Sequence, residues 1–203
     1  MILTPFAAGE MSNASLSDAS DASARRPPIV VLTGFMASGK TTTGETLAGL
    51  LGWEFIDLDS EIEKQQGVAI KLLFQQRGEC GFRELEHEAL RDCLTRCTNP
   101  TVVALGGGAF VQSRNAAVIL AHHARTVFLE APTEDMLLRG GVEGDLHPER
   151  ARPLATDREA FLRLYEQRLP SYRTASVTIA TAGKDIAEVA QEIATRFQLR
   201  PCR

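Results

Sequence analysis

The stretch that decides the fold of this chain is Gly34-Phe-Met-Ala-Ser-Gly39-Lys40-Thr41, which matches the phosphate-binding pattern G-x-x-x-x-G-K-[ST]. Glycines let such a loop curl, so that successive backbone N–H groups point at phosphate oxygens. The lysine of the pattern reaches the β- and γ-phosphates, and the hydroxyl after it joins the ligand shell of Mg²⁺. The stretch therefore predicts a nucleoside triphosphate site that includes Lys40 and Thr41.

The residues on either side of this loop support the prediction. Residues 28–33 form a short β-branched run that is typical of a buried strand, and residues 42–51 carry apolar side chains at helical spacing. A strand, a glycine-rich loop and a helix in this order place the helix N-terminus, with its partial positive charge, at the phosphates. The alternative is an ordinary glycine turn with an exposed lysine, which would not require a strand before it and a helix after it.

Length and composition narrow the classes of protein further. The chain has 203 residues, enough for one domain with a substantial core, and its net charge of −4 argues against a broad nucleic-acid or anionic-membrane surface. No apolar run reaches the length of a transmembrane span, and the N-terminus lacks the pattern of a secretory signal. The four cysteines form no CxxC pair, so we expect reduced thiols in a cytoplasmic protein.

Short apolar runs alternate with helical patterns from residue 28 onward. Five of these runs read as strands, at residues 28–33, 53–56, 101–105, 125–129 and 176–180. Strands separated by helices predict an α/β fold, a three-layer αβα sandwich around a five-stranded parallel sheet. Residues 1–26 are rich in Ala, Ser and Asp, and we expect a disordered extension there, with the folded domain at residues 27–203.

Ligands of such open sheets bind beyond the carboxyl ends of the strands, so the residues just after each strand are the candidate site. Asp57 and Asp59 follow the second strand, and residues at i and i+2 leaving a strand project the same way, so we expect both carboxylates to converge on one site. One would hold Mg²⁺ and the other would accept a proton or orient a hydroxyl. The alternative is that one of them only caps the next helix.

Two further clusters have both a functional and an ordinary interpretation. Gly106-Gly107-Gly108 follows the third strand, where bare backbone would let a small ligand lie against the main chain; the alternative is a flexible turn. Arg83 is a natural partner for a ligand carboxylate, and Glu86 at i+3 would hold its guanidinium. From these residues alone, a surface Arg–Glu pair is the favoured interpretation.

Residues 139–154 contain three glycines, two prolines and three of the chain's arginines. Glycine hinges and cations above a triphosphate site are typical of a closing lid, which excludes water and neutralises developing phosphate charge. The alternative is a variable surface loop.

Six motifs, taken in order, closely resemble those of the shikimate kinase family. They are Gly34-x-Met-x-x-Gly-Lys40-Thr41, Asp57-x-Asp59-x-x-Ile-Glu63, Gly78-Glu-x-x-Phe-Arg83-x-x-Glu86, Gly106-Gly-Gly108, Arg152-Pro-Leu154 and Arg168-x-x-x-Tyr172, spread over roughly residues 28–198. The resemblance implies a P-loop kinase fold with substrate-binding helices and a mobile lid. It also implies ATP- and Mg²⁺-dependent phosphorylation of the 3-hydroxyl of shikimate, in chorismate biosynthesis, by a monomer that binds neither nucleic acid nor membrane.

The resemblance assigns a role to each candidate residue. Shikimate would be bound through its hydroxyls by Asp59, through its carboxylate by Arg83 and Arg168, and along the main chain by Gly106, Gly107 and Gly108. The catalytic residues would be Lys40, Asp59 and Arg152. Mg²⁺ would be bound by Thr41, with Asp57 helping through water. The ATP site would consist of Gly34, Ala37, Ser38, Gly39, Lys40, Thr41, Thr42, Arg139 and Arg152, with Arg139 stacked on the adenine.

Three features depart from the family pattern. Ala37 stands where the family usually has glycine, a change between small residues from which we expect little consequence. The segment between Arg139 and Arg152 is longer and more acidic than the usual lid, so either Arg150 or Arg152 meets the phosphate. The residues after the last strand, 180–183, lack the proline often found near the adenine.

Two other functions remain open alternatives. A related P-loop kinase would act on gluconate or on a nucleoside monophosphate, but Arg83, Arg168 and the three glycines favour a carboxylated polyol. A nucleotide-dependent switch is a different class of protein, and the chain has no [NT]KxD tetrapeptide for reading guanine.

Overall fold

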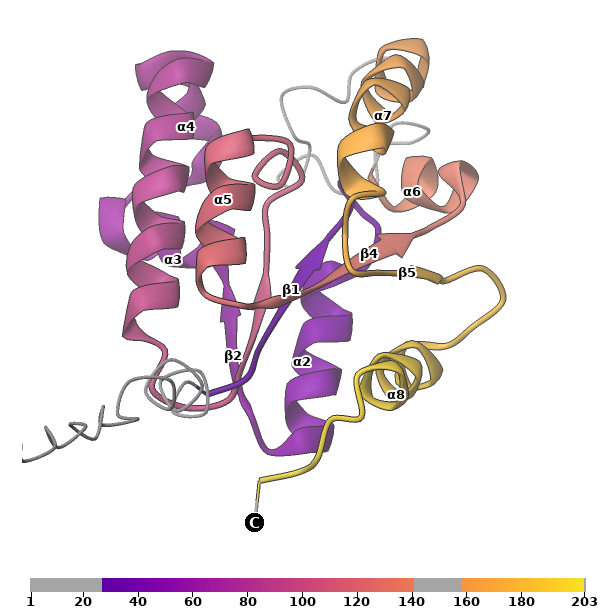
Figure 1. Cartoon of the computed structure of the whole chain (residues 1–203). Coiled ribbons are helices and arrows are strands. Elements are labelled where there is room, and N and C mark those ends of the chain that lie inside the picture. Colours follow the sequence, from indigo (N-terminus) through magenta and orange to yellow (C-terminus); the bar gives the residue numbers. More distant parts are fainter. Residues whose placement is uncertain (1–26, 141–157, 203) are drawn as a thin grey trace, which may run out of the picture.

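A five-stranded parallel sheet forms the centre of the protein (Figure 1). The structure, a computed structural model, describes residues 27–140 and 158–202. The strands are β1 (Ile29–Thr33), β2 (Glu54–Asp57), β3 (Thr101–Ala104), β4 (Arg125–Glu130) and β5 (Val177–Ala180). They lie in the order β2-β3-β1-β4-β5, and each neighbouring pair is parallel. The predicted α/β class and parallel sheet are confirmed.

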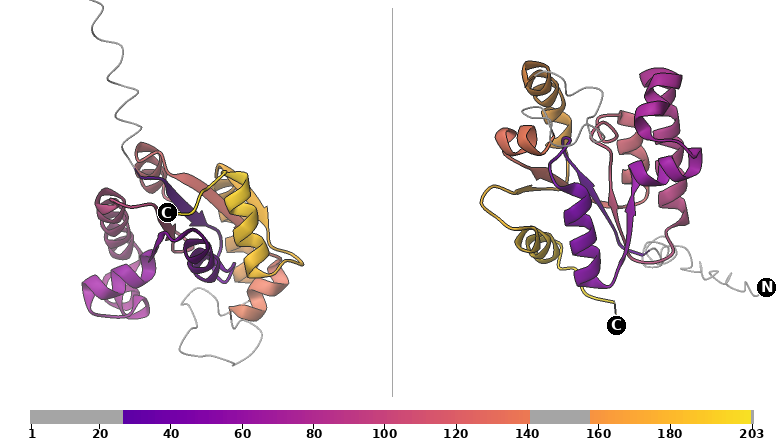
Figure 2. Two further views of the ribbon diagram at one scale, coloured as in Figure 1. Left: turned by 90° about the horizontal axis from the view of Figure 1, so that it is seen from below. Right: turned by 180° about the vertical axis from the view of Figure 1, so that it is seen from behind.

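Helices cover both faces of this sheet (Figures 1 and 2). Two helices, α2 (Lys40–Leu51) and α8 (Ile186–Arg196), pack together on one face. The other face is covered by α3 (Leu58–Gln66), α4 (Ile70–Arg96), α5 (Ser113–Ala121), α6 (Thr133–Arg139) and α7 (Arg158–Tyr172). The three predicted layers are therefore present in the described part of the chain.

The alternation of side chains along β1 explains the two cores. Val30 and Leu32 join the apolar cluster under α2 and α8, whereas Ile29 and Val31 join the cluster on the opposite face. Successive side chains of a strand point to opposite faces, so a central strand that is covered on both sides is apolar throughout. Burying β1 from both sides fixes the direction in which the phosphate-binding loop leaves it.

Glycines end α3 and bend α4. Gly67 ends α3 at φ 69°, and Gly78 interrupts α4 with φ 65° and ψ −178°. Both positions use a left-handed φ that glycine adopts without steric cost. Because α4 bends at Gly78, side chains from both of its halves line one cavity, Phe74 before the bend and Arg83 after it.

Some predictions concern residues that the structure does not describe. The predicted disordered extension, residues 1–26, and nearly all of the predicted lid, including Arg150 and Arg152, lie outside the described residues. Within residues 27–140 and 158–202, no helix combines the length and the apolar character needed to span a membrane. All four cysteines lie in these ranges and are free thiols, as expected.

Candidate active site

The phosphate-binding loop connects β1 to α2. Gly34 has φ 146°, and a Cβ there would lie 2.8 Å from the carbonyl oxygen of Leu129, so only glycine fits. Gly39 caps α2 at φ 90° and gives the helix no side-chain cap. The first N–H groups of α2 are thus available to an anion, which the helix dipole also favours.

Two polar side chains of the loop are buried next to this helix end. The Lys40 ammonium group donates to the carbonyl oxygen of Phe35 at 2.7 Å, and the residue is 7% exposed. The Ser38 hydroxyl is buried without a hydrogen-bond partner among the described residues. A buried hydroxyl of this kind costs free energy unless it finds a partner, and a phosphate oxygen would be one. The loop residues therefore fit a bound triphosphate.

Ala37 adopts a backbone conformation that alanine does not favour. Its φ is 60°, in the left-handed region, where a Cβ costs roughly 1–2 kcal/mol. We expected a small-for-small replacement of glycine with little consequence. The backbone shows that the replacement carries a conformational cost, because the position requires a φ that glycine adopts freely.

Thr41 and Asp57 meet where the loop faces the end of β2. The Thr41 hydroxyl donates to Asp57 Oδ2 at 2.7 Å, and Asp57 Oδ1 accepts from the Ser60 backbone N–H at 3.1 Å. Asp57 therefore caps α3, as the alternative interpretation held, and it also pairs with the loop threonine, while its help in binding Mg²⁺ stays a prediction. A hydroxyl beside a carboxylate is an oxygen pair suited to Mg²⁺.

Asp59 occupies a different position from the one we predicted. It lies in the first turn of α3 rather than on the strand, and it lines the cavity beside Gly106. Because the chain turns into a helix at Asp57, the i,i+2 rule for strands does not apply to this pair. The strand argument for this pair therefore fails, whereas the expected division of roles between the two carboxylates at one site stays a prediction. Asp57 contacts the phosphate-binding loop, whereas Asp59 belongs to the neighbouring cavity.

That cavity has a volume of about 160 Å³ and is framed by α3, α4, α7 and the glycines after β3. It is smaller than pockets for drug-sized ligands, roughly 300–1,000 Å³, and so suits a small metabolite. Its lining combines apolar side chains with five charged ones. The apolar residues are Met36, Ile70, Phe74 and Phe82, and the charged residues are Asp59, Glu79, Arg83, Glu86 and Arg168.

The three glycines after β3 are required by close approach rather than by backbone conformation. A Cβ on Gly106 would lie 2.5 Å from Asp59 Oδ1, and one on Gly107 would lie 3.2 Å from the Met36 backbone nitrogen. A Cβ on Gly108 would lie 2.4 Å from Arg83 Nη2. The run is thus closely packed against side chains of the cavity rather than a free turn, and the contact of a ligand with this main chain stays a prediction.

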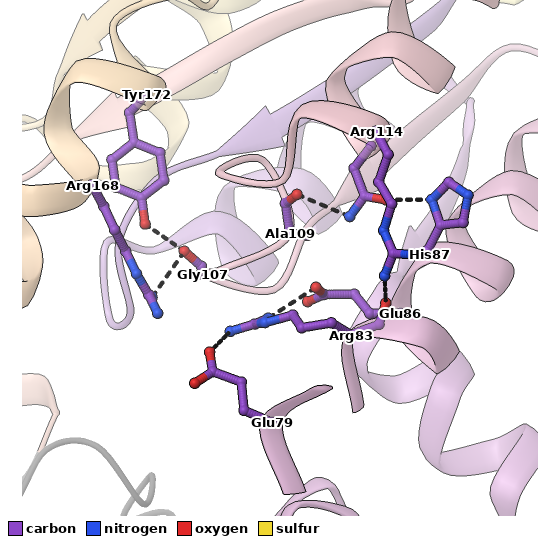
Figure 3. A network of polar contacts seen from close by, with 10 residues as sticks. Glu79, Arg83, Glu86, His87, Gly107, Ala109, Arg114, Arg168 and Tyr172 are labelled. Atoms are coloured by element: carbon purple, nitrogen blue, oxygen red, sulfur yellow. Dashed lines mark hydrogen bonds and ion pairs between the residues drawn. The ribbon is translucent and has the colours of Figure 1, made fainter. Parts of the chain in front are cut away.

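Arg83 is buried, with only 8% of the residue exposed (Figure 3). Its Nη1 donates to Glu86 at 2.9 Å and its Nη2 pairs with Glu79 at 3.2 Å. Its Nε is buried without a hydrogen-bond partner among the described residues. The surface Arg–Glu pair favoured from the residues alone is wrong, because the bend at Gly78 and the core residue Phe82 turn this segment inward.

Glu86 is the most deeply buried carboxylate of the cavity, 1% exposed. Burial raises its pKa to about 7 even though Arg83 opposes the shift, and the nearby Asp59 carboxylate adds to the increase. A group with this pKa exchanges a proton near neutral pH. The charge of the cavity therefore depends on pH.

Arg168 reaches the same cavity from α7 (Figure 3). Its Nη1 donates to the Gly107 carbonyl oxygen at 3.3 Å, and the Tyr172 hydroxyl donates to the same oxygen. Burial raises the pKa of Tyr172 to about 12, so the hydroxyl keeps its proton. Arg83 and Arg168 come from helices far apart in the sequence, and the fold brings them to one cavity, as predicted.

Several residues of the site were not among our candidates. Glu79 and Tyr172 stand inside the motifs quoted above, so the spacing could have identified them. Phe74 and Phe82 stack at 4.3 Å between ring centroids and form an apolar wall, which no local sequence pattern predicts.

Arg139 ends α6 in an exposed pair with Asp135 at 3.1 Å, and its contact with adenine stays a prediction.

Comparison with known proteins agrees with this geometry. A family model described as shikimate kinase matches residues 36–198. Shikimate kinases of Geobacter sulfurreducens and Moorella thermoacetica are 43% and 39% identical over 169 residues, covering 82% of this chain and 88% and 92% of theirs. The structure of Acinetobacter baumannii shikimate kinase in complex with shikimate superposes with a TM-score of 0.77 at 34% identity, covering 86% of this chain and 94% of that one. With this site and these relatives, the chain belongs to the shikimate kinase family.

Proposed function

We propose that this shikimate kinase transfers the γ-phosphoryl group of ATP to the 3-hydroxyl of shikimate held in the cavity between α3, α4 and α7. One observation carries the assignment of the acceptor. Two buried arginines, Arg83 and Arg168, face a single small cavity that adjoins the phosphate-binding loop. Buried guanidinium groups are suited to bidentate recognition of one carboxylate, and shikimate carries one.

The acceptor is oriented by groups on opposite sides of the cavity. Arg83 and Arg168 bind the carboxylate, and the orphaned Nε of Arg83 supplies a donor that the protein itself leaves unpaired in the described part. Asp59, beside Gly106, accepts from ring hydroxyls and receives the proton of the attacking hydroxyl. Fixing the carboxylate at one end and the hydroxyls at the other selects a ring with both groups.

The nucleotide is bound by the loop and by the start of α2. The N–H groups of residues 34–42 and Lys40 bind the phosphates, and Lys40 exchanges its bond to Phe35 for a phosphate oxygen. Thr41 and Asp57 would hold Mg²⁺, with Asp57 helping through water. A bound Mg²⁺ would supply positive charge that offsets the negative charge of the phosphates.

The remaining roles rest on the resemblance to the family. Arg152 stabilises the transferring group and Arg139 stacks on the adenine. We propose that the enzyme acts as a cytoplasmic monomer.

Two of the alternatives, a nucleoside monophosphate kinase and a switch protein, fit the cavity less well. A nucleoside monophosphate would need a site for a base and a phosphate, whereas this cavity of about 160 Å³ is small and presents two arginines. A switch protein has no need of an acceptor cavity at all. ADP release measured with shikimate, gluconate or CMP as sole acceptor tests the proposal, with the product identified by NMR. Shikimate should be strongly preferred and give the 3-phosphate, and a clear preference for another acceptor would refute it.

A further inference from the structure

A buried amide lies just outside the cavity, in the first turn of α5. Asn115 is 0% exposed, and its Nδ2 donates to the carbonyl oxygen of Ala109 at 2.9 Å. Its Oδ1 lies 2.7 Å from Nδ1 of His87 on α4. Figure 3 shows Ala109 beside Gly107, and His87 on the same helix as Arg83. Asn115 therefore links α4 to the chain that leaves the three glycines.

Only one arrangement of hydrogens satisfies this link. A carbonyl oxygen can only accept, so the amide nitrogen of Asn115 must face Ala109 and its oxygen must face His87. Nδ1 of His87 then carries a hydrogen and donates to that oxygen. The neutral ring with this tautomer and the protonated ring both supply the donor, so the bridge persists in either state.

The hydrogen bonds of Asn115 join the same two segments of the chain as the close contact between Gly108 and Arg83. Ala109 directly follows Gly108, and His87 lies one helical turn after Arg83. Gly108 and Arg83 approach so closely that a Cβ would collide with the guanidinium group. A second link reinforces the first, because Nη2 of Arg114 donates to the Arg83 carbonyl oxygen at 2.8 Å. The same two segments are thus fixed both inside and outside the cavity.

We propose that Asn115 is a positioning residue for the acceptor carboxylate. Through Ala109 and His87 it sets the spacing between Gly108 and Arg83, and so keeps the guanidinium group aimed into the cavity. The inference rests on the proposed function, in which Arg83 binds the carboxylate of shikimate. Hydrogen bonds to a buried amide are directional, and removing the amide frees the loop to move relative to α4.

A positioning role and a merely structural role give different kinetics. A loss of folded enzyme lowers the apparent kcat and leaves both KM values unchanged. A displaced Arg83 weakens the hold on shikimate alone. Asn115→Ala and His87→Leu should each raise KM for shikimate by about tenfold, because displacements of an ångström in a binding group have effects of this size or larger. KM for ATP should change less than about twofold.

The matched variant is His87→Asn, whose amide nitrogen stands close to the place of Nδ1 and keeps a donor for Asn115. It should return KM for shikimate most of the way to the wild-type value. Arg91→Ala is the control on the same helix, since its side chain is 57% exposed and, within the described residues, pairs with the exposed Asp92. It should match the wild type.

The outcomes separate the two proposals. Wild-type enzyme that does not turn over shikimate would overturn the proposed function and this inference with it. Active wild-type enzyme whose Asn115→Ala variant keeps its KM for shikimate, or raises KM for both substrates equally, would overturn the positioning role alone. If Asn115→Ala does not fold, the two His87 variants provide the test. Equal KM values for shikimate in His87→Leu and His87→Asn would then contradict the positioning role.

Discussion

The backbone of Gly108 rests directly on the guanidinium group of Arg83, so that a Cβ at this glycine would stand 2.4 Å from Nη2 and 2.5 Å from Nη1. The guanidinium group is itself fixed by Glu86 at 2.9 Å. Any side chain at Gly108 must therefore move the arginine or the loop. This contact couples the glycine run after β3 to the binding of the acceptor carboxylate.

Gly108→Ala should reduce kcat/KM for shikimate by roughly 30- to 150-fold, because displacing a charge-assisted contact costs about 2–3 kcal/mol. Steady-state kinetics at saturating ATP measure the effect. Gly49→Ala is the matched control, since it lies in α2 where a Cβ meets nothing within 4 Å. Equal activity of the two variants would show that the loop yields easily and that the close approach is not functional.

Arg83→Lys and Arg168→Lys should each raise KM for shikimate strongly, since an ammonium group cannot reproduce a bidentate contact with a carboxylate. The loss of one such contact corresponds to roughly 30- to 150-fold in kcat/KM. The methyl ester of shikimate lacks the negative charge, so kcat/KM for this ester should differ little between the wild type and the variants. Unchanged kinetics in both variants would mean that another group binds the carboxylate.

Thr41→Val should raise the Mg²⁺ concentration for half-maximal activity by about tenfold or more, because it removes an oxygen ligand while keeping the shape of the side chain. A titration of activity with Mg²⁺ at fixed ATP checks this. Thr46→Val is the control in the same helix, where the hydroxyl donates to the Thr42 carbonyl oxygen at 2.9 Å. A normal Mg²⁺ titration for Thr41→Val would exclude Thr41 as a ligand.

The pH dependence of the free energy of unfolding should show the titration of Glu86. Its folded-state pKa of about 7 lies above its ordinary value of 4.5, so the folded state binds more protons than the unfolded state between these pH values. The free energy of unfolding should therefore fall as the pH rises from about 4.5 to about 7, by an amount on the order of 3 kcal/mol, and level off above. Urea titrations across this range measure it. Glu86→Gln should flatten the profile, and an unchanged slope would assign the titration to another group.

Arg152→Ala should lower kcat by at least about 100-fold while changing the binding of ATP and shikimate little, because a cation that meets the transferring group acts in the transition state. Arg150→Ala is the comparison. If Arg150→Ala loses activity and Arg152→Ala is nearly normal, the longer segment has moved the catalytic cation by two positions.

The sequence determined the architecture because its signals are local. The strand predicted at residues 28–33 is β1 at Ile29–Thr33, and the strand predicted at residues 125–129 is β4 at Arg125–Glu130. A run of apolar residues, a glycine with left-handed φ and the G-x-x-x-x-G-K-[ST] loop each act through neighbours along the chain. These features also suffice to predict that phosphates bind at the N-terminus of α2.

Only the tertiary structure decided how the acceptor cavity is built. Arg83 reads as half of a surface ion pair, because its i+3 spacing to Glu86 says nothing about the packing of α4 against the sheet. Asp57 and Asp59 look equivalent in sequence, yet the turn into α3 sends one to Thr41 and the other to Gly106. Burial and contacts between residues such as Arg168 and Gly107, 61 positions apart, arise when helices pack. Such contacts have no local pattern, so they become visible only once the chain is folded.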